Sequence, residues 1–395
     1  MRFSTYFILM IGLWAGAAGS CSAQQQSPTC EQGNGHFEAE FRGTGVRVRI
    51  GALRHEGLAI RSCKASLSWN NGSLSVVENA DEVDLDAFGV DFGLGAPVAA
   101  FQVKPSEKDC CAEYRLYSLS KAPRLLRTIR GGSWFSAADK DLDGQVEIWT
   151  DDADAVSRFD GLNLAELDFA PKVIFRFVHG RLLDVSSEFA DYFDRELLKL
   201  QERVSSDDLR EFKRSDGKLL SQTDPAERLH SLRVTKAKIL EMVWCYLYSG
   251  REQRAWQALS DMWPAADAGR IHTLISSAYA HGIRAQIEGN SPGAGKRRKA
   301  AIFDVTDLTG ERGADLLAPE PIVLTRPTPP ETSRESDAEL VLVIDSAGKV
   351  RSADAGKSEA NAALIDASAA WKFIPAFKNG RAVACRMRLA ISNRQ

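Results

Sequence analysis

The sequence predicts a multidomain α+β protein, because strand-like and helix-like segments are segregated along the chain instead of alternating. Residues 37–185 hold short apolar runs separated by Gly, Asn and Asp, which is the pattern of an antiparallel β domain. Residues 186–288 change to a helical periodicity. A proline-rich stretch at 289–337 then precedes residues 338–395, which predict a small β-β-α-β module.

The composition is that of soluble globular domains. The chain has 395 residues, of which 44% are hydrophobic and 26% charged, and this length is enough for two or three domains. The formal net charge of −3 gives no broad basic surface, so we expect no nucleic-acid partner. After about the first twenty residues no segment is long and apolar enough to span a bilayer. We therefore expect no transmembrane helix in the mature chain.

Residues 1–23 have the pattern of a secretory signal peptide, so we expect an exported protein. Arg2 gives a positive start, Tyr6–Ala18 is an apolar core too short for a comfortable membrane span, and small residues follow. Cleavage at the end of this segment would release a soluble chain. Alternatively, Ala18-Gly19-Ser20-Cys21 resembles a lipoprotein lipobox, in which case Cys21 would carry a lipid anchor.

The β domain is predicted from its alternation and its turns. Val46–Ile50 alternates apolar and basic residues, as a half-exposed strand does. Ser66–Trp69 and Ser73–Val77 flank Asn70-Asn71-Gly72, which has the chemistry of a hairpin turn. We expect a sandwich or a partial propeller. Further strand candidates are Pro97–Val103, Glu113–Leu119, Leu125–Ile129, Val146–Thr150 and Val173–Val178.

The cysteines predict disulfides in an exported chain. Of the seven cysteines, Cys21 belongs to the leader region, and the other six allow about 15 pairings. Four of these six fall in the N-terminal third, which suits a disulfide-stapled domain in an oxidising compartment. We expect Cys63 to pair with Cys110 or Cys111, and Cys30 to take the other.

Residues 186–288 predict antiparallel helices, and residues 289–337 predict a flexible linker. Pro319–Ser336 contains five prolines, a composition that favours a semi-extended tether. The helix candidates are a charged segment around Leu197–Leu200, then Pro225–Gly250, Arg251–Trp263 and Ala266–Ile287.

Residues 139–147 have the spacing of a calcium-binding loop. Three carboxylates stand at alternate positions, and Gly144 permits the tight turn that would make them converge. The loop resembles the Asp-x-Asp-x-Asp-Gly-x-x-Asp/Glu loops of FG-GAP or VCBS propeller repeats, which implies a structural Ca²⁺ ion. The alternative is an acidic surface turn. A stretch with two alternate acids, Asp84 and Asp86, resembles a degenerate second copy. The predicted ligands are Asp139, Asp141, Asp143, the backbone carbonyl of Gln145 and Glu147.

Catalytic motifs are weak, so we expect a protein that is not an enzyme. Gly289–Lys296 imitates a phosphate-binding loop, but its spacing is too long and Arg297 stands where Ser or Thr is needed. Ser118–Lys121 has the spacing of a penicillin-recognising serine without the companion motifs. The six histidines are scattered. A hydrolase is the alternative and would need a cleft.

The C-terminal segment carries the most specific pattern. The aliphatic run Glu339–Asp345 predicts a buried strand, and Ser346-Ala347-Gly348 predicts a turn. Glu359–Ala370 predicts an alanine-rich helix. Asn379-Gly380 predicts a hairpin turn before a closing strand at Arg381–Ile391. Together these elements predict a compact module with an open sheet edge.

This pattern resembles the TonB C-terminal domain. The residues that carry the resemblance are Asp345-x-x-Gly348-x-Val350, Trp371-Lys-Phe373-Ile-Pro375-Ala376 and Asn379-Gly380. The resemblance implies a periplasmic module that adds a short segment of an outer-membrane transporter to its sheet edge. This chain departs from the family in its shorter tether and its cleavable leader, which puts direct energy transduction in doubt.

These observations predict a non-enzymatic envelope protein of a double-membraned bacterium, periplasmic or associated with the outer membrane. Its module would bind an outer-membrane or periplasmic partner by strand addition, with an outer-membrane transporter as one candidate. The alternative is a calcium-dependent extracytoplasmic recognition or adhesion protein.

Overall fold

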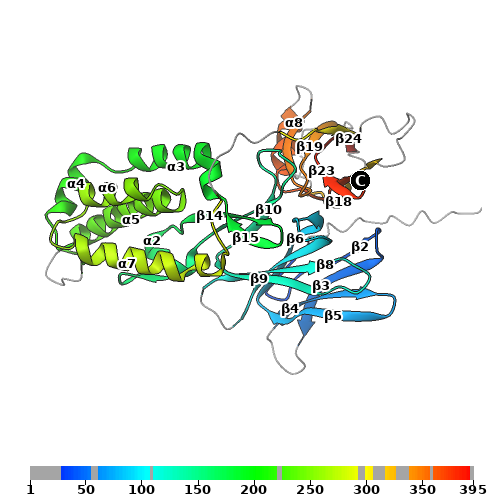
Figure 1. The fold of residues 1–395 in the computed structure, drawn as a ribbon, viewed down its shortest axis with the longest axis horizontal. Coiled ribbons are helices and arrows are strands. Elements are labelled where there is room, and N and C mark those ends of the chain that lie inside the picture. Colours follow the sequence, from blue (N-terminus) through cyan, green and yellow to red (C-terminus); the bar gives the residue numbers. More distant parts are fainter. Residues whose placement is uncertain are drawn as a thin grey trace, which may run out of the picture.

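The computed structural model of the protein describes residues 28–54, 61–106, 110–219, 225–291, 299–305, 316–325, 338–355 and 359–391. Over these residues the fold is mixed α+β, with eight α-helices and mainly antiparallel sheets. In Figure 1 helices α3–α7 occupy one end of the molecule and most of the sheets the other. No helix in this part of the chain is both long and apolar enough to cross a membrane. The expected signal peptide and Cys21 lie outside the described residues.

Two antiparallel sheets pack face to face in the N-terminal part. Their strand orders are β2-β3-β4-β5 and β1-β6-β7-β8-β9. Both sheets contribute to one buried cluster that includes Phe37, Leu67 and Phe101, as the two sheets of a sandwich do. The predicted hairpin is confirmed, because Trp69 pairs with Gly72. The strands are β1 (Thr29–Glu31), β2 (His36–Phe41), β3 (Val46–Arg54), β4 (Arg61–Trp69), β5 (Gly72–Ala80), β6 (Glu82–Asp91), β7 (Pro97–Lys104), β8 (Ala112–Ser118) and β9 (Leu125–Gly132).

A third antiparallel sheet, of order β10-β11-β14-β15, shares a core with the second sheet and the helices. The acidic loop predicted as a calcium site connects its first two strands. The elements are β10 (Phe135–Ala138), β11 (Glu147–Asp151), α1 (Ala153–Val156), β12 (Arg158–Phe159), β13 (Leu162–Asn163), α2 (Leu164–Leu167), β14 (Lys172–Val178) and β15 (Arg181–Asp184).

The middle of the chain is helical, as predicted. Helix α5 is central, because it packs against α3, α4 and α6 and buries Trp244 and Tyr248. It ends just before Gly250, whose φ of 77° suits a residue that follows a helix. The helices are α3 (Ala190–Glu202), α4 (Ser206–Lys213), α5 (Ala226–Tyr248), α6 (Glu252–Met262) and α7 (Ala268–His281), with 3₁₀ turns at Ser186–Phe189 and Ile283–Gln286.

The C-terminal module, defined here as residues 338–391, contains the predicted strands, helix and turns. Gly348 has a φ of 77°, and Asn379 and Gly380 have φ of 52° and 77°, as a two-residue hairpin turn requires. The closing strand is divided into β23 and β24, which belong to different sheets. The elements are β19 (Ala338–Ile344), β20 (Val350–Asp354), α8 (Glu359–Ser368), β21 (Lys372–Ile374), β22 (Ala376–Lys378), β23 (Arg381–Val383) and β24 (Cys385–Ile391).

Parts of the expected linker are paired with the C-terminal module. β16 (Phe303–Asp304) pairs with β24, β17 (Leu316–Leu317) with β22, and β18 (Glu320–Val323) with β21. These segments differ from the free tether expected from the proline content. Extended residues without internal hydrogen bonds are also what a sheet edge accepts, so composition alone could not distinguish the two states.

Two cysteine pairs are at disulfide distance, and they are not the expected pairs. Cys30 is bonded to Cys63, and Cys110 to Cys111. The predicted pairing of Cys63 with Cys110 or Cys111 is wrong, because β1 places Cys30 beside Cys63 in the sandwich core. Their Cα atoms are 5.8 Å apart. Cys110 and Cys111 lie just before β8 and are not part of that core.

Candidate functional site

The acidic loop between β10 and β11 turns tightly at its middle. Leu142 and Gly144 have positive φ angles of 58° and 86°. Asp139 closes the loop, because its carboxylate accepts the backbone N–H groups of Asp143 and Gly144, each at 3.0 Å. The turn predicted at Gly144 is therefore present.

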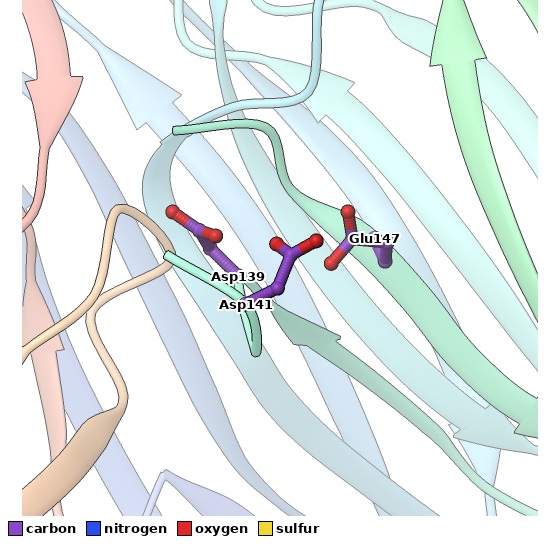
Figure 2. Close-up of side chains that lie close together, drawn as sticks. All are labelled: Asp139, Asp141 and Glu147. Atoms are coloured by element: carbon purple, nitrogen blue, oxygen red, sulfur yellow. The ribbon is translucent and has the colours of Figure 1, made fainter. Parts of the chain in front are cut away.

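Three of the five predicted metal ligands come together in this loop. Carboxylate oxygens of Asp139, Asp141 and Glu147 lie within 4.8 Å of one another. Figure 2 shows the first two on the loop and Glu147 on the strand that follows, with the carboxylates of Asp141 and Glu147 facing each other. Asp139 and Glu147 are fully buried. Oxygen donors of this kind suit a hard divalent cation such as Ca²⁺.

Of the other two predicted ligands, Asp143 does not belong to this group of carboxylates and is bonded to Gln145 instead. The backbone N–H of Gln145 donates to one carboxylate oxygen of Asp143 at 2.8 Å, and its side-chain amide donates to the other at 3.1 Å. The three clustered carboxylates fit Ca²⁺ in donor type but supply only part of the roughly six to eight oxygens that it takes. Water or backbone carbonyls would have to complete the coordination.

Cations flank the three carboxylates and offset part of their charge. Arg176 lies 3.6 Å from a carboxylate oxygen of Glu147 and 2.8 Å from one of Glu188. Lys140 places its Nζ 3.4 Å from the centre of the Trp149 ring. Burial, together with the neighbouring charge of Arg351, lowers the pKa of Lys140 to about 8. The site is thus a mixed cluster of charges and not an isolated acidic patch.

A turn of the C-terminal module contacts the acidic loop. Ser346 Oγ donates to Asp139 Oδ2 at 2.9 Å, and the N–H of Asp139 donates to Asp345 Oδ2 at 3.1 Å. Burial, together with the charge of Asp345, raises the pKa of Asp139 to about 6. Asp345 is itself paired with Arg351 at 2.7 Å. The candidate metal centre therefore lies at the junction between the third sheet and the C-terminal module.

The acids resembling a second calcium loop are bound by lysines instead. Lys349 Nζ lies 2.7 Å from Asp86, and Lys372 Nζ lies 2.9 Å from Asp84. Tyr114 also donates its hydroxyl to Asp86 at 2.6 Å. Burial pushes the pKa of Asp86 upward, but the two lysines and Tyr114 outweigh burial, and the pKa is lowered. These partly buried pairs attach the C-terminal module to β6.

Comparison of the chain with protein-family models, with curated proteins and with solved structures finds no match. The resemblances to the TonB C-terminal domain and to FG-GAP or VCBS loops therefore rest on the residues quoted above. They stay predictions.

A cavity of about 430 Å³ lies beside the acidic loop. Residues of three parts of the chain line it, among them Phe92 of the sandwich region, Gly144 of the loop and Arg381 of the C-terminal module. Ser346, which bonds to Asp139, also contributes to the lining. An ion or a small polar ligand could approach the junction from this side.

The sheet of the C-terminal module ends in the edge strand β20 on one side. On the other side, the first residues of β24 pair with β16 in parallel register. Phe303 lies opposite Cys385, and Asp304 lies opposite Arg386. From Met387 to Ile391, the outer side of β24 pairs with no strand of the described residues. Among the described residues, this half of β24 is an open edge, as is β20 on the opposite side.

The sequence did not reveal the contacts across the junction. Asp345 was predicted only as the end of a strand and Ser346 only as part of a turn, and nothing was predicted for Lys349. Their partners are remote, since Asp139 lies 206 positions from Asp345 and Asp86 lies 263 positions from Lys349. No local pattern signals such pairs.

Proposed function

We propose that this chain is an exported, non-enzymatic binding protein of the envelope of a double-membraned bacterium. Its C-terminal module adds an extended segment of an outer-membrane or periplasmic partner to its sheet, and an outer-membrane transporter is one candidate partner. Strand addition supplies affinity through main-chain hydrogen bonds and specificity through alternate side chains.

The outer edge of β24 is the observation that carries this proposal. The carbonyl groups of Ala384 and Arg386 point outward there, because both accept hydrogen bonds from β16. Backbone groups of alternate residues point to the same side of a strand. The N–H and carbonyl of Arg388 and Ala390 therefore also point outward, where an added strand would bond.

Export is supported by the leader pattern and by the cysteines. Residues 1–23 have the three regions of a signal peptide. The Cys30–Cys63 bond lies inside the sandwich core, and such bonds persist in oxidising compartments. Mass spectrometry of the mature N-terminus distinguishes cleavage after Ala23 from lipidation at Cys21.

One proline substitution in each of the two sheet edges tests strand addition. Arg388→Pro removes an outward N–H of β24 and the exposed ion pair of Arg388 with Glu339, but no backbone hydrogen bond to β19, and proline is tolerated at such edge positions. Ala353→Pro in β20 is the matched control on the opposite edge. Tagged mature protein is used to capture proteins from a solubilised envelope. We expect Arg388→Pro to lose the captured partner and Ala353→Pro to keep it. Equal capture by both variants would contradict the proposal.

A second candidate function is calcium-dependent recognition or adhesion, favoured by the convergence of Asp139, Asp141 and Glu147. Ligand binding would then disappear with chelator and survive Arg388→Pro. Deleting the C-terminal module is a poor test, because Ile374 of the module belongs to the sandwich core. If ligand binding is unchanged by chelator but is lost in Arg388→Pro, the result favours strand addition over calcium-dependent recognition.

A further inference from the structure

The outer edge of β24 already holds a strand from the same chain. The N–H of Phe303 donates to the carbonyl of Ala384 at 3.0 Å. Two residues on, the N–H of Val305 donates to the carbonyl of Arg386 at 2.9 Å. Val305 is 5% exposed and belongs to the core of the C-terminal module. Residues 303–305 thus use this edge as an added strand does, with backbone bonds on one side and an apolar side chain in the core.

We propose that residues 303–305 are an internal ligand that occupies the strand-acceptor edge of β24 and must leave before a partner strand binds there. This inference rests on the proposed function and adds its regulation. The occupant that replaces the internal strand is an extended segment of a partner protein, parallel to β24, with apolar residues alternating with acidic ones as in Phe303-Asp304-Val305.

The charges of β24 favour an acidic residue between the apolar ones. Arg386 and Arg388 are exposed and, as alternate residues of one strand, project from the same face. Asp304 is exposed and stands opposite Arg386 in the register. A longer partner strand would bring its next side chain on this face to Arg388, where an acid would compete with the exposed Glu339 that pairs with Arg388 at 3.5 Å.

The internal strand is short enough to be displaced. Its few backbone hydrogen bonds are opposed by the entropy of ordering the residues that make them. β24 continues to Ile391, and a partner strand that follows it gains hydrogen bonds beyond Arg386 that residues 303–305 do not make. Because residues 303–305 belong to the same chain as β24, their effective concentration at this edge is on the order of millimolar, and a partner must bind more tightly than this competition.

A peptide with the sequence of residues 299–305 tests the acceptor edge directly. The dye-labelled peptide is titrated, by fluorescence anisotropy, into the full mature chain and into its Phe303→Asp/Val305→Asp variant. The variant can no longer bury the internal strand, so we expect it to bind the peptide at least tenfold more tightly. A peptide with aspartate at both positions should bind neither protein. Equal affinity of the two proteins, or no binding to a variant with a wild-type melting curve, overturns the proposal.

An engineered disulfide keeps the proposal testable if that variant does not fold. Asp304 and Arg386 are exposed and directly paired, so Asp304→Cys/Arg386→Cys can hold the internal strand in place. We expect the oxidised chain to capture the envelope partner at least tenfold less well, and mild reduction to restore capture. Unchanged capture by the oxidised chain overturns the proposal. Peptide binding as expected, without capture of any envelope protein, supports the acceptor edge and counts against the proposed function.

Discussion

At the scale of single residues, similar acids have different roles because their partners differ. The chain has two runs of alternating aspartates, and in the first run Asp84 and Asp86 each receive a lysine from the C-terminal module. In the second run, Asp143 is held by its neighbour Gln145. The carboxylates that remain close to one another are those of Asp139, Asp141 and Glu147. The spacing of acidic residues in the sequence therefore predicts more metal ligands than the structure brings together.

The pair Asp141→Asn and Asp143→Asn tests cation binding at this loop. A ligand present at 100 times its Kd adds about 2.7 kcal/mol to the free energy of unfolding. We expect Ca²⁺ to raise the Tm of the wild type by several degrees. Asp141→Asn should lose most of this rise, whereas Asp143→Asn should keep it. Scanning calorimetry with Ca²⁺ and with chelator measures the effect, and a wild type that melts identically in both contradicts the metal centre.

The lowered pKa of Asp86 predicts a loss of stability in acid. Its folded pKa lies below the value of the unfolded chain, about 3.9, so its contribution is complete above that pH and is lost as the pH falls below it. At pH 6, Asp86→Asn leaves Lys349 buried without its charge partner and should cost about 3–5 kcal/mol. Urea unfolding should show this gap to the wild type narrowing between pH 6 and pH 3. If the difference in unfolding free energy between the wild type and Asp86→Asn stayed constant over this pH range, the lowered pKa of Asp86 would be contradicted.

At the scale of elements, the tight turns at Gly348 and Gly380 share a backbone conformation but differ in surroundings. Both have φ of 77°. A Cβ at Gly348 would overlap the carbonyl oxygen of Phe373, whereas nothing lies within 4 Å of a Cβ at Gly380. The N–H of Phe373 also donates to the carbonyl of Gly348 at 2.9 Å. The first turn is therefore fixed by tertiary packing and the second by its own conformation.

This difference predicts unequal effects of alanine at the two glycines. Gly380→Ala should cost about 1–2 kcal/mol, the penalty of a left-handed L residue. Gly348→Ala adds a clash with backbone that cannot move independently of β21, so we expect at least twice the loss, or insoluble protein. Soluble yield and urea midpoints measure both variants. Similar midpoints would show that the close approach of Phe373 does not constrain this turn.

The sequence was sufficient to predict many individual strands, helices and turns. It was not sufficient to predict which of them pack against each other. Asn379-Gly380 specifies its turn because few residues adopt positive φ, and the helical period of residues 226–248 is local. The loop at Gly144 was predictable for the same reason. The Cys30–Cys63 bond and the pairing of β16 with β24 depend instead on how distant strands pack. Neither contact can be predicted from the residues next to it in the sequence.

At the scale of the whole molecule, the C-terminal module belongs to the cores of the parts that precede it. Ile374 lies in the core of the sandwich, and Ala347 lies in the core shared by the third sheet and the helices. The ring of Phe377 lies 6.1 Å from that of Phe41. The module is therefore packed as a structural component and also presents an edge to solvent.

This arrangement predicts that the module and the sandwich unfold together. Native-state hydrogen exchange, followed by mass spectrometry across a urea series, should give amides of β19 and of β7 the same opening free energy. The double variant Lys349→Met/Lys372→Met leaves Asp86 and Asp84 without their cations, and each broken buried pair costs about 3–5 kcal/mol. Its β19 amides should open at lower urea than its β7 amides. The exposed pair Lys64→Met/Lys104→Met is the control and should leave the two coincident. Separate openings already in the wild type would mean that the lysine–aspartate pairs do not join the module to the sandwich.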